Sequence, residues 1–429
     1  GSPITNRLTL GESGRIGGAT TTAVEDWCLD ALTGHSGAEP GLGGELSNLT
    51  VVVPSRERQD YLLRQIRYWS ASPASLVIVD GSSSPLPDRI RSAVEAYPRI
   101  TYRHDPSSMA DRLRLAGSLI ESPYAVMLGD DEFHLPAGLG ASVRVLDSDK
   151  KLVGCMGQVL SFSPVGPYRR IVFAHAYSSM HGYSIRHNLA ADRLIAAMSD
   201  YTMATCYAVL RTPIWRRSWG SVAGYASGAA QELQQAMAVY LLGPFTTTDH
   251  VQWLRSIENL NEPVSPEEEG GKIWFPEWWE SQRFAAERSR FTMTLATVVA
   301  GELAVSHDEC SGWVTAGAQT YVDNHRKFFE LLSKRSAPRL LPLVGRVLRA
   351  IARFLPDPLF LGAKRVRGSV LRALGRPGGS YYGTVDDLPR ILASQGLLLT
   401  PEDEEELNAI EAMVGEFHSL RADKSQGGV

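Results

Sequence analysis

The sequence predicts an α/β fold in which a central, mostly parallel sheet is flanked by helices and followed by a helical C-terminal region. Two observations predict it. Between Leu49 and Leu128, short apolar runs alternate with segments whose apolar residues recur at helical spacing. Strands and helices that alternate in this way form βαβ units, which build parallel sheets. From about residue 263 onward, helical spacing dominates.

The expected elements follow in chain order. Four strands are predicted at 49–55 (LTVVVPS), 75–80 (SLVIVD), 100–105 (ITYRHD) and 124–128 (YAVML). Runs rich in β-branched residues are typical of strands buried on both faces. Helices are expected between them at 60–69, 89–97 and 108–120. A helix at 137–146, a strand pair (LVGCMGQVLSF and RRIVFAHAY) and helices at 192–199, 213–219 and 229–242 complete the series.

Three regions are expected along the chain. Residues 1–46 form an N-terminal extension, partly disordered, residues 47–262 form the sheet domain, and residues 263–429 form a mainly helical C-terminal region. The segment EPVSPEEEGG is interpreted as a linker. The segment 338–376 is basic and amphipathic, which suits an anionic membrane surface. The alternative is a helix packed on the protein with a solvated basic face.

Composition narrows the function classes. The net charge is only −4, so nucleic acid is not an expected partner. The four cysteines form no CxxC pair, which indicates free thiols in a reducing compartment. No apolar run reaches the length of about 18 residues that a membrane span needs. The expected location is the cytoplasm, with peripheral attachment to the inner face of the membrane as an open option.

Polar and acidic groups follow three of the predicted strands at the point where each strand ends. Pro54, Ser55 and Arg56 end the first strand, Asp80 ends the second, and residues 130–132 (Asp-Asp-Glu) follow the fourth. In open α/β sheets, ligands bind outside the carboxyl ends of the strands. Each group has a plainer interpretation, because Asp-Gly favours turns and acidic residues end many strands. Together they predict a ligand site with a divalent metal.

Ordered motifs carry a resemblance to a known family. They are VVVPSRERQDYLLRQI, LVIVDGSSSP, MADRLRLAGSLIESPYAVMLGDDEFHLP and GAAQELQQAMAVYLLG. In this order they resemble the inverting glycosyltransferases of the GT-A fold, family 2-like, which use nucleotide-diphosphate sugars. The resemblance covers the chain from Leu49 to about Asn261, and it implies a GT-A fold for the sheet domain.

The resemblance also implies roles for individual residues. A nucleotide pocket would include Pro54, Ser55, Arg56, Asp80, Arg112 and Asp130. A Mn²⁺ or Mg²⁺ ion would be held by Asp131, Glu132 and His250, and oxygen ligands suit both ions. The catalytic base would be Glu232. Alternatives remain for three of them: Glu232 as a solvated helix residue, Arg112 as an i,i+4 partner of nearby charges, and His250 as an exposed histidine.

The motifs depart from the family at two places. Gly129 takes the position of the first aspartate in the usual Asp-x-Asp, and Gln231-Glu232 replaces the usual Glu-Asp. The predicted function is metal-assisted, inverting transfer of a sugar from a nucleotide-diphosphate sugar to a hydroxyl of a glycan or lipid-linked glycan, as in surface polysaccharide synthesis. A non-catalytic, nucleotide-binding or scaffold relative is the main alternative. A nucleotidyltransferase is the second.

Other residues have weaker signals. His175, His181 and His187 repeat every six residues in a segment expected to be an acceptor-side loop. Arg255 is a candidate contact for phosphate or acceptor. The tryptophan-rich stretches WRRSW and WFPEWW suit either stacking on sugar rings or packing between domains, with packing favoured.

Overall fold

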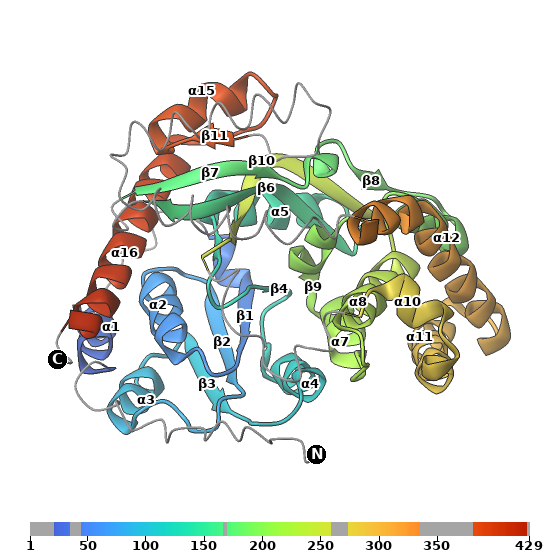
Figure 1. Cartoon of the computed structure of the whole chain (residues 1–429), viewed down its shortest axis with the longest axis horizontal. Helices are drawn as coiled ribbons and strands as arrows, with labels where there is room; N and C mark the ends of the chain where they lie inside the picture. The colour runs from blue at the N-terminus through green and yellow to red at the C-terminus, as the bar shows by residue number, and fades with distance from the viewer. Residues whose placement is uncertain (1–20, 35–43, 166–169, 259–272, 335–380, 427–429) are drawn as a thin grey trace, which may run out of the picture.

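The computed structural model describes residues 21–34, 44–165, 170–258, 273–334 and 381–426. The expected α/β class is confirmed, since a central sheet is flanked by helices (Figure 1). Within the described residues, eleven strands join this sheet, and its main path has the order β11-β7-β6-β9-β4-β1-β2-β3.

The first half of the sheet is entirely parallel. It consists of β1 (Leu49–Ser55), β2 (Ser75–Asp80), β3 (Ile100–His104) and β4 (Tyr124–Met127). In its register, Ser55 lies opposite Asp80, and Asp80 lies opposite His104. The connecting helices are α2 (Gln59–Ser70), α3 (Asp88–Glu95) and α4 (Met109–Leu119). The carboxyl ends of these strands therefore form one continuous edge, as the βαβ pattern predicted.

The second half of the sheet is mixed. Strands β9 (Val209–Arg211), β6 (Gly154–Val165), β7 (Arg170–Ala176) and β11 (Tyr381–Gly383) extend it antiparallel from β4. Strand β10 (Phe245–Ser256) pairs parallel with β6 and antiparallel with β5 (Phe133–His134) and β8 (Ser184–Ile185). Strand β10 was not expected from the sequence, because its first half is mostly polar and only Phe245 and residues 251–254 are fully buried. His175 belongs to β7 and not to a loop.

The helices of the C-terminal region pack at two different places. Helices α10 (Phe275–Glu280), α11 (Ala285–Leu303) and α12 (His307–Lys334) lie beside α6 (Ala190–Ser199), α7 (Thr212–Ser218) and α8 (Gly228–Leu242). On the opposite side of the molecule, α16 (Pro401–Gln426) contacts α1 (Thr21–Gly34) and α5 (Pro136–Ser148), and α15 (Leu388–Ala393) lies near β11 (Figure 1).

Buried tryptophans hold the first of these groups together. Trp215 and Trp278 are fully buried and Trp219 nearly so, which fits the packing role, whereas Trp274 of the second stretch is 52% exposed. The expected linker and the basic segment 338–376 lie outside the described residues. Where the chain is described, no helix is long and apolar enough to cross a membrane.

Candidate functional site

Arg112 lies against the carboxyl ends of β1 and β2. It is 4% exposed, and its Nη1 donates a hydrogen bond to the carbonyl of Ser55. A Cβ on Gly81 would lie 2.6 Å from the Arg112 guanidinium carbon, so glycine is needed for this close approach. The guanidinium therefore reaches the sheet edge, whereas an i,i+4 partner would stay on the surface of α4.

Asp80 orders the loop after β2. Its carboxylate is fully buried and accepts hydrogen bonds from the backbone and hydroxyl of Ser82, from Gln59 Nε2 (3.0 Å) and from the Tyr102 hydroxyl (2.9 Å). The bond from the Ser82 N–H (2.9 Å) closes an Asx turn. These contacts fit the plainer interpretation, in which Asp80 and Gly81 form a turn. A nucleoside contact by Asp80 remains a prediction, and it would have to share this carboxylate with the loop.

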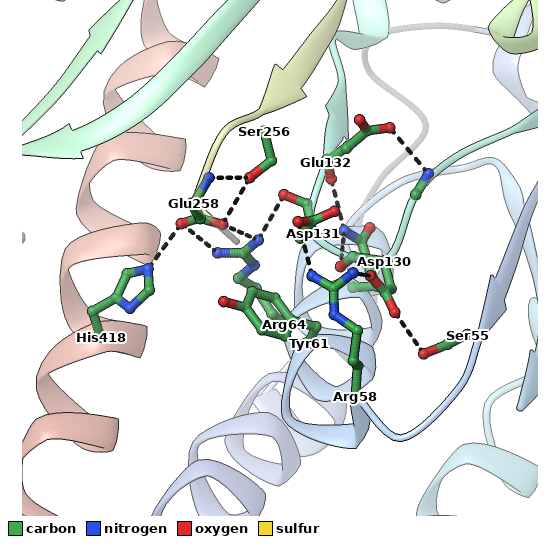
Figure 2. A network of polar contacts seen from close by, with 12 residues as sticks. Ser55, Arg58, Tyr61, Arg64, Asp130, Asp131, Glu132, Ser256, Glu258 and His418 are labelled. Carbon is green, nitrogen blue, oxygen red and sulfur yellow. Dashed lines mark hydrogen bonds and ion pairs between the residues drawn. The ribbon is translucent and has the colours of Figure 1, made fainter. Parts of the chain in front are cut away.

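An arginine that the sequence analysis did not single out bridges the acidic motif. Arg58 Nη1 lies 2.9 Å from Asp130 Oδ1, and its Nη2 lies 2.8 Å from Asp131 Oδ2. Ser55 Oγ donates to the other oxygen of Asp130 at 2.6 Å. Figure 2 shows the Arg58 guanidinium pointing toward both carboxylates. Three of the predicted residues are thus brought together, with Arg58 between the two acids.

The loop between β1 and α2 positions Arg58 next to the acidic motif at residues 130–132. Pro54 is half-buried in β1 and Arg56 is half-exposed just beyond it. Glu57 has a left-handed backbone (φ +55°), which is uncommon outside glycine and costs about 1–3 kcal/mol. Its N–H donates to Ser82 Oγ (2.8 Å), and its Oε1 accepts from the N–H of Ser83 (2.6 Å). These bonds hold the strained turn in place.

Glu132 occupies the space beside the glycine that replaces the family's first aspartate. Its Oε2 accepts from the N–H of Gly129 (3.3 Å) and from Trp253 Nε1 (3.0 Å). A Cβ on Gly129 would lie 2.8 Å from that oxygen. Burial, and then the charge of Asp131, raise the pKa of Glu132 to about 8. The Glu132 carboxylate therefore turns toward the backbone and the indole.

The acidic residues, as they lie, do not form a metal site. Across the described residues, no group of three or more His, Cys, Asp or Glu side chains is placed to hold a metal ion. Arg58 already bridges Asp130 and Asp131. His250 lies on β10 but lines a separate cavity of about 740 Å³ with Arg144 and Asp403. The structure thus does not bring His250 to the motif.

Glu232 and Arg255 form the other side of the site. Glu232 is half-buried on α8; burial raises its pKa to about 7, and the Arg255 guanidinium acts in the opposite direction. The same guanidinium lowers the pKa of Glu132 against the effect of burial. Arg255 is therefore close enough to both carboxyl groups to influence their pKa values.

An aromatic stack lines this side. The Trp253 ring stacks on Tyr207 (ring centroids 3.8 Å apart, 18°) and on Tyr177 (5.7 Å, 9°). Arg255 lies over the Tyr177 ring, 5.6 Å from its centroid. Tyr177 also has a left-handed backbone, with φ of +53°. The stack buries Trp253, which is 1% exposed, and leaves Tyr177 and Tyr207 partly exposed.

A buried ion-pair network supports the motif from behind. Arg64 is 0% exposed; its Nη2 donates to the Asp131 carbonyl (2.8 Å) and pairs with Glu258. His418 Nε2, on α16, lies 2.8 Å from the second oxygen of Glu258 (Figure 2). This network was not predicted from the sequence, although a lone arginine on the apolar face of α2 was a signal.

Comparisons with known proteins give distant structural similarities only. No family model matches the chain, and no curated protein sequence does. The structure of S. aureus TarS 1–349 in complex with UDP-GlcNAc has a TM-score of 0.39 and 10% identity, covering 66% of this chain and 91% of that one. The mannosyltransferase PcManGT from Pyrobaculum calidifontis, in complex with GDP-Man and Mn²⁺, has a TM-score of 0.34 and 14% identity, covering 96% of each chain. At these levels, function has to be argued from the site itself.

Proposed function

We propose that this protein is a glycosyltransferase that moves a sugar, with inversion, from a nucleotide-diphosphate sugar to a hydroxyl of a glycan or lipid-linked glycan. The supporting observation is the position of Arg255: it lies over the Tyr177 ring, which stacks on Trp253, and Trp253 Nε1 donates to Glu132 at the sheet edge. The Arg255 charge also opposes the rise in the pKa of Glu232 on α8. A donor at the strand ends and an acceptor at Glu232 would therefore share one site. The proposed location is the cytoplasm, and membrane contact through 338–376 remains a prediction.

The proposed chemistry uses a single displacement. Glu232 takes the proton of the acceptor hydroxyl, and that oxygen attacks the anomeric carbon from the face opposite the diphosphate. A carboxyl with a pKa near 7 is a better base than an ordinary glutamate and is still ionised in part at neutral pH. Negative charge develops on the departing diphosphate, and Arg58 and Arg112 are the guanidinium groups at that edge.

A non-catalytic nucleotide-binding or scaffold protein is the second candidate. One observation favours it: Gly129 supplies no carboxylate to the acidic motif. This candidate predicts nucleotide binding without sugar transfer, and Glu232 would have no chemical role.

Thermal unfolding against UDP and GDP tests the proposal first. A ligand that binds only the folded protein, at a hundred times its Kd, stabilises it by about 2.7 kcal/mol. The expected result is a higher Tm with one of the two, followed by slow hydrolysis of the corresponding sugar nucleotide. Glu232→Gln should keep the Tm shift and lose the hydrolysis. Binding with no turnover would favour the second candidate, and no binding would remove both.

A further inference from the structure

The cation between Asp130 and Asp131 belongs to the chain itself. We propose that Arg58 takes the place of the divalent metal, so that the diphosphate of the donor binds to an arginine and not to a metal ion. This inference rests on the proposed function for its ligand. It departs from the metal-assisted mechanism that the family resemblance implies.

The first support is geometric. One guanidinium reaches both carboxylates, 2.9 Å from Asp130 and 2.8 Å from Asp131, and it fills the position between them. Ser55 Oγ donates a hydrogen bond to the other carboxylate oxygen of Asp130. A metal held by both acids would have to displace Arg58, because the two cations would compete for the same oxygens.

The second support is the order of exposure. The Arg58 side chain is 28% exposed, whereas those of Asp130 and Asp131 are 6% and 16% exposed. Arg58 is therefore the more exposed member of the ion pair, although its Nε and Nη2 atoms are themselves buried. Guanidinium groups carry five N–H donors in a planar fork, which suits phosphate oxygens. Among the described residues Arg58 Nε has no hydrogen-bond partner, so this donor is left for a phosphate oxygen.

The third support is the absence of a replacement ligand for a metal among the described residues. Gly129 has no side chain, the Glu132 carboxylate is turned to Trp253, and His250 lines another cavity. Arg112 adds a second guanidinium at the end of β1. Two arginines thus match Asp130 and Asp131 in charge, so the two acids do not repel a diphosphate even without a metal.

The test measures metal and nucleotide binding separately. Mn²⁺ binding is followed by the electron paramagnetic resonance signal of free Mn²⁺, for the full chain alone and with UDP or GDP. Nucleotide affinity is measured by calorimetry in EDTA and in MnCl₂. The variants are Arg58→Gln and Arg114→Gln; Arg114 is an exposed arginine that pairs with Asp111 on α4 and serves as the matched control.

The expected result is that wild-type protein takes up no Mn²⁺ and binds its nucleotide equally well in EDTA and in MnCl₂. Arg58→Gln should bind the nucleotide roughly ten- to a hundredfold more weakly, the range for losing a hydrogen bond to a charged group. Arg114→Gln should bind like wild type. A wild-type Mn²⁺ site that Asp131→Asn removes would overturn the proposal, as would unchanged nucleotide affinity in Arg58→Gln.

Failure of the proposed function is a separate outcome. If neither UDP nor GDP binds to wild type, the glycosyltransferase proposal falls. The role of Arg58 is then decided by Mn²⁺ alone: a Mn²⁺ site gained in Arg58→Gln and absent from wild type supports it, and no gain overturns it.

Discussion

Arg64 and Glu258, 194 positions apart in the chain, form a two-pronged buried ion pair with N–O distances of 3.1 and 2.9 Å. The pair joins α2 to the residues just after β10. Because Arg64 also donates to the carbonyl of Asp131, and Glu258 contacts His418, the backbone of the acidic motif is connected to α16. The C-terminal helix therefore belongs to the support of the candidate site.

Removing one member of this pair should destabilise the whole fold. Glu258→Gln leaves the Arg64 charge buried without its carboxylate, a change that typically costs about 3–5 kcal/mol. Urea unfolding measures it directly. Glu416→Gln is the control, since that exposed residue contacts Arg67 only at 4.0 Å and should change stability by less than about 0.5 kcal/mol. Equal stability of the two variants would show that the buried pair contributes nothing.

The same pair predicts sensitivity to acid. Although burial opposes ionisation, Arg64 and His418 lower the pKa of Glu258 to about 2. In the unfolded chain a glutamate titrates near pH 4.3. The contribution of Glu258 is therefore complete above that pH and is lost as the pH falls toward 2. Unfolding free energies measured between neutral pH and pH about 3 should fall less steeply in Glu258→Gln than in wild type; an identical slope would exclude this role.

The proposed base predicts a pH–rate profile. Glu232 must be ionised to accept a proton, and its pKa is raised to about 7 by burial. Turnover should therefore be low below pH 7 and rise to a plateau above it. Glu232→Gln should lower kcat by about 10²–10⁴-fold. Glu280→Gln, at an exposed position on α10, serves as the control with wild-type kcat. A profile that is flat through pH 7 would show that Glu232 does not accept the proton of the acceptor hydroxyl.

The parts that the sequence analysis predicted correctly depend on local patterns. Buried strands such as β1 and β2 are readable because their apolar runs are continuous. Strand β10 was missed because its first half is polar and its pairing with β6 is interrupted by bulges. Local patterns also place the acidic motif at a strand end, and the parallel sheet brings the neighbouring strand ends to the same edge.

Contacts between distant segments could not be predicted in this way. Arg58 belongs to the motif VVVPSRERQDYLLRQI, but only the left-handed turn at Glu57 and the fold of the sheet direct it to Asp130. The contact of Glu258 with Arg64 depends on two elements whose proximity no local pattern encodes. The direction of the Glu132 carboxylate depends on Trp253, which belongs to the unexpected strand β10.

Gly129 and Glu132 should show strong energetic coupling. A Cβ at position 129 would lie 2.8 Å from Glu132 Oε2, so Gly129→Ala forces the carboxylate away from Trp253 Nε1. Overpacking of this kind typically costs about 1–3 kcal/mol. Glu132→Ala removes the obstacle, so the double variant should lose less stability than the sum of the single ones, by about 0.5–3 kcal/mol.

Urea unfolding of the four proteins in this cycle measures the coupling. Gly220→Ala is the control, because a Cβ there meets no atom within 4 Å, and its effect should be small with or without Glu132→Ala. Additive losses for Gly129→Ala and Glu132→Ala would show that the Glu132 carboxylate does not occupy the space beside residue 129. Coupling confined to the Gly129 cycle would mean that an aspartate at position 129 cannot be accommodated unless Glu132 moves.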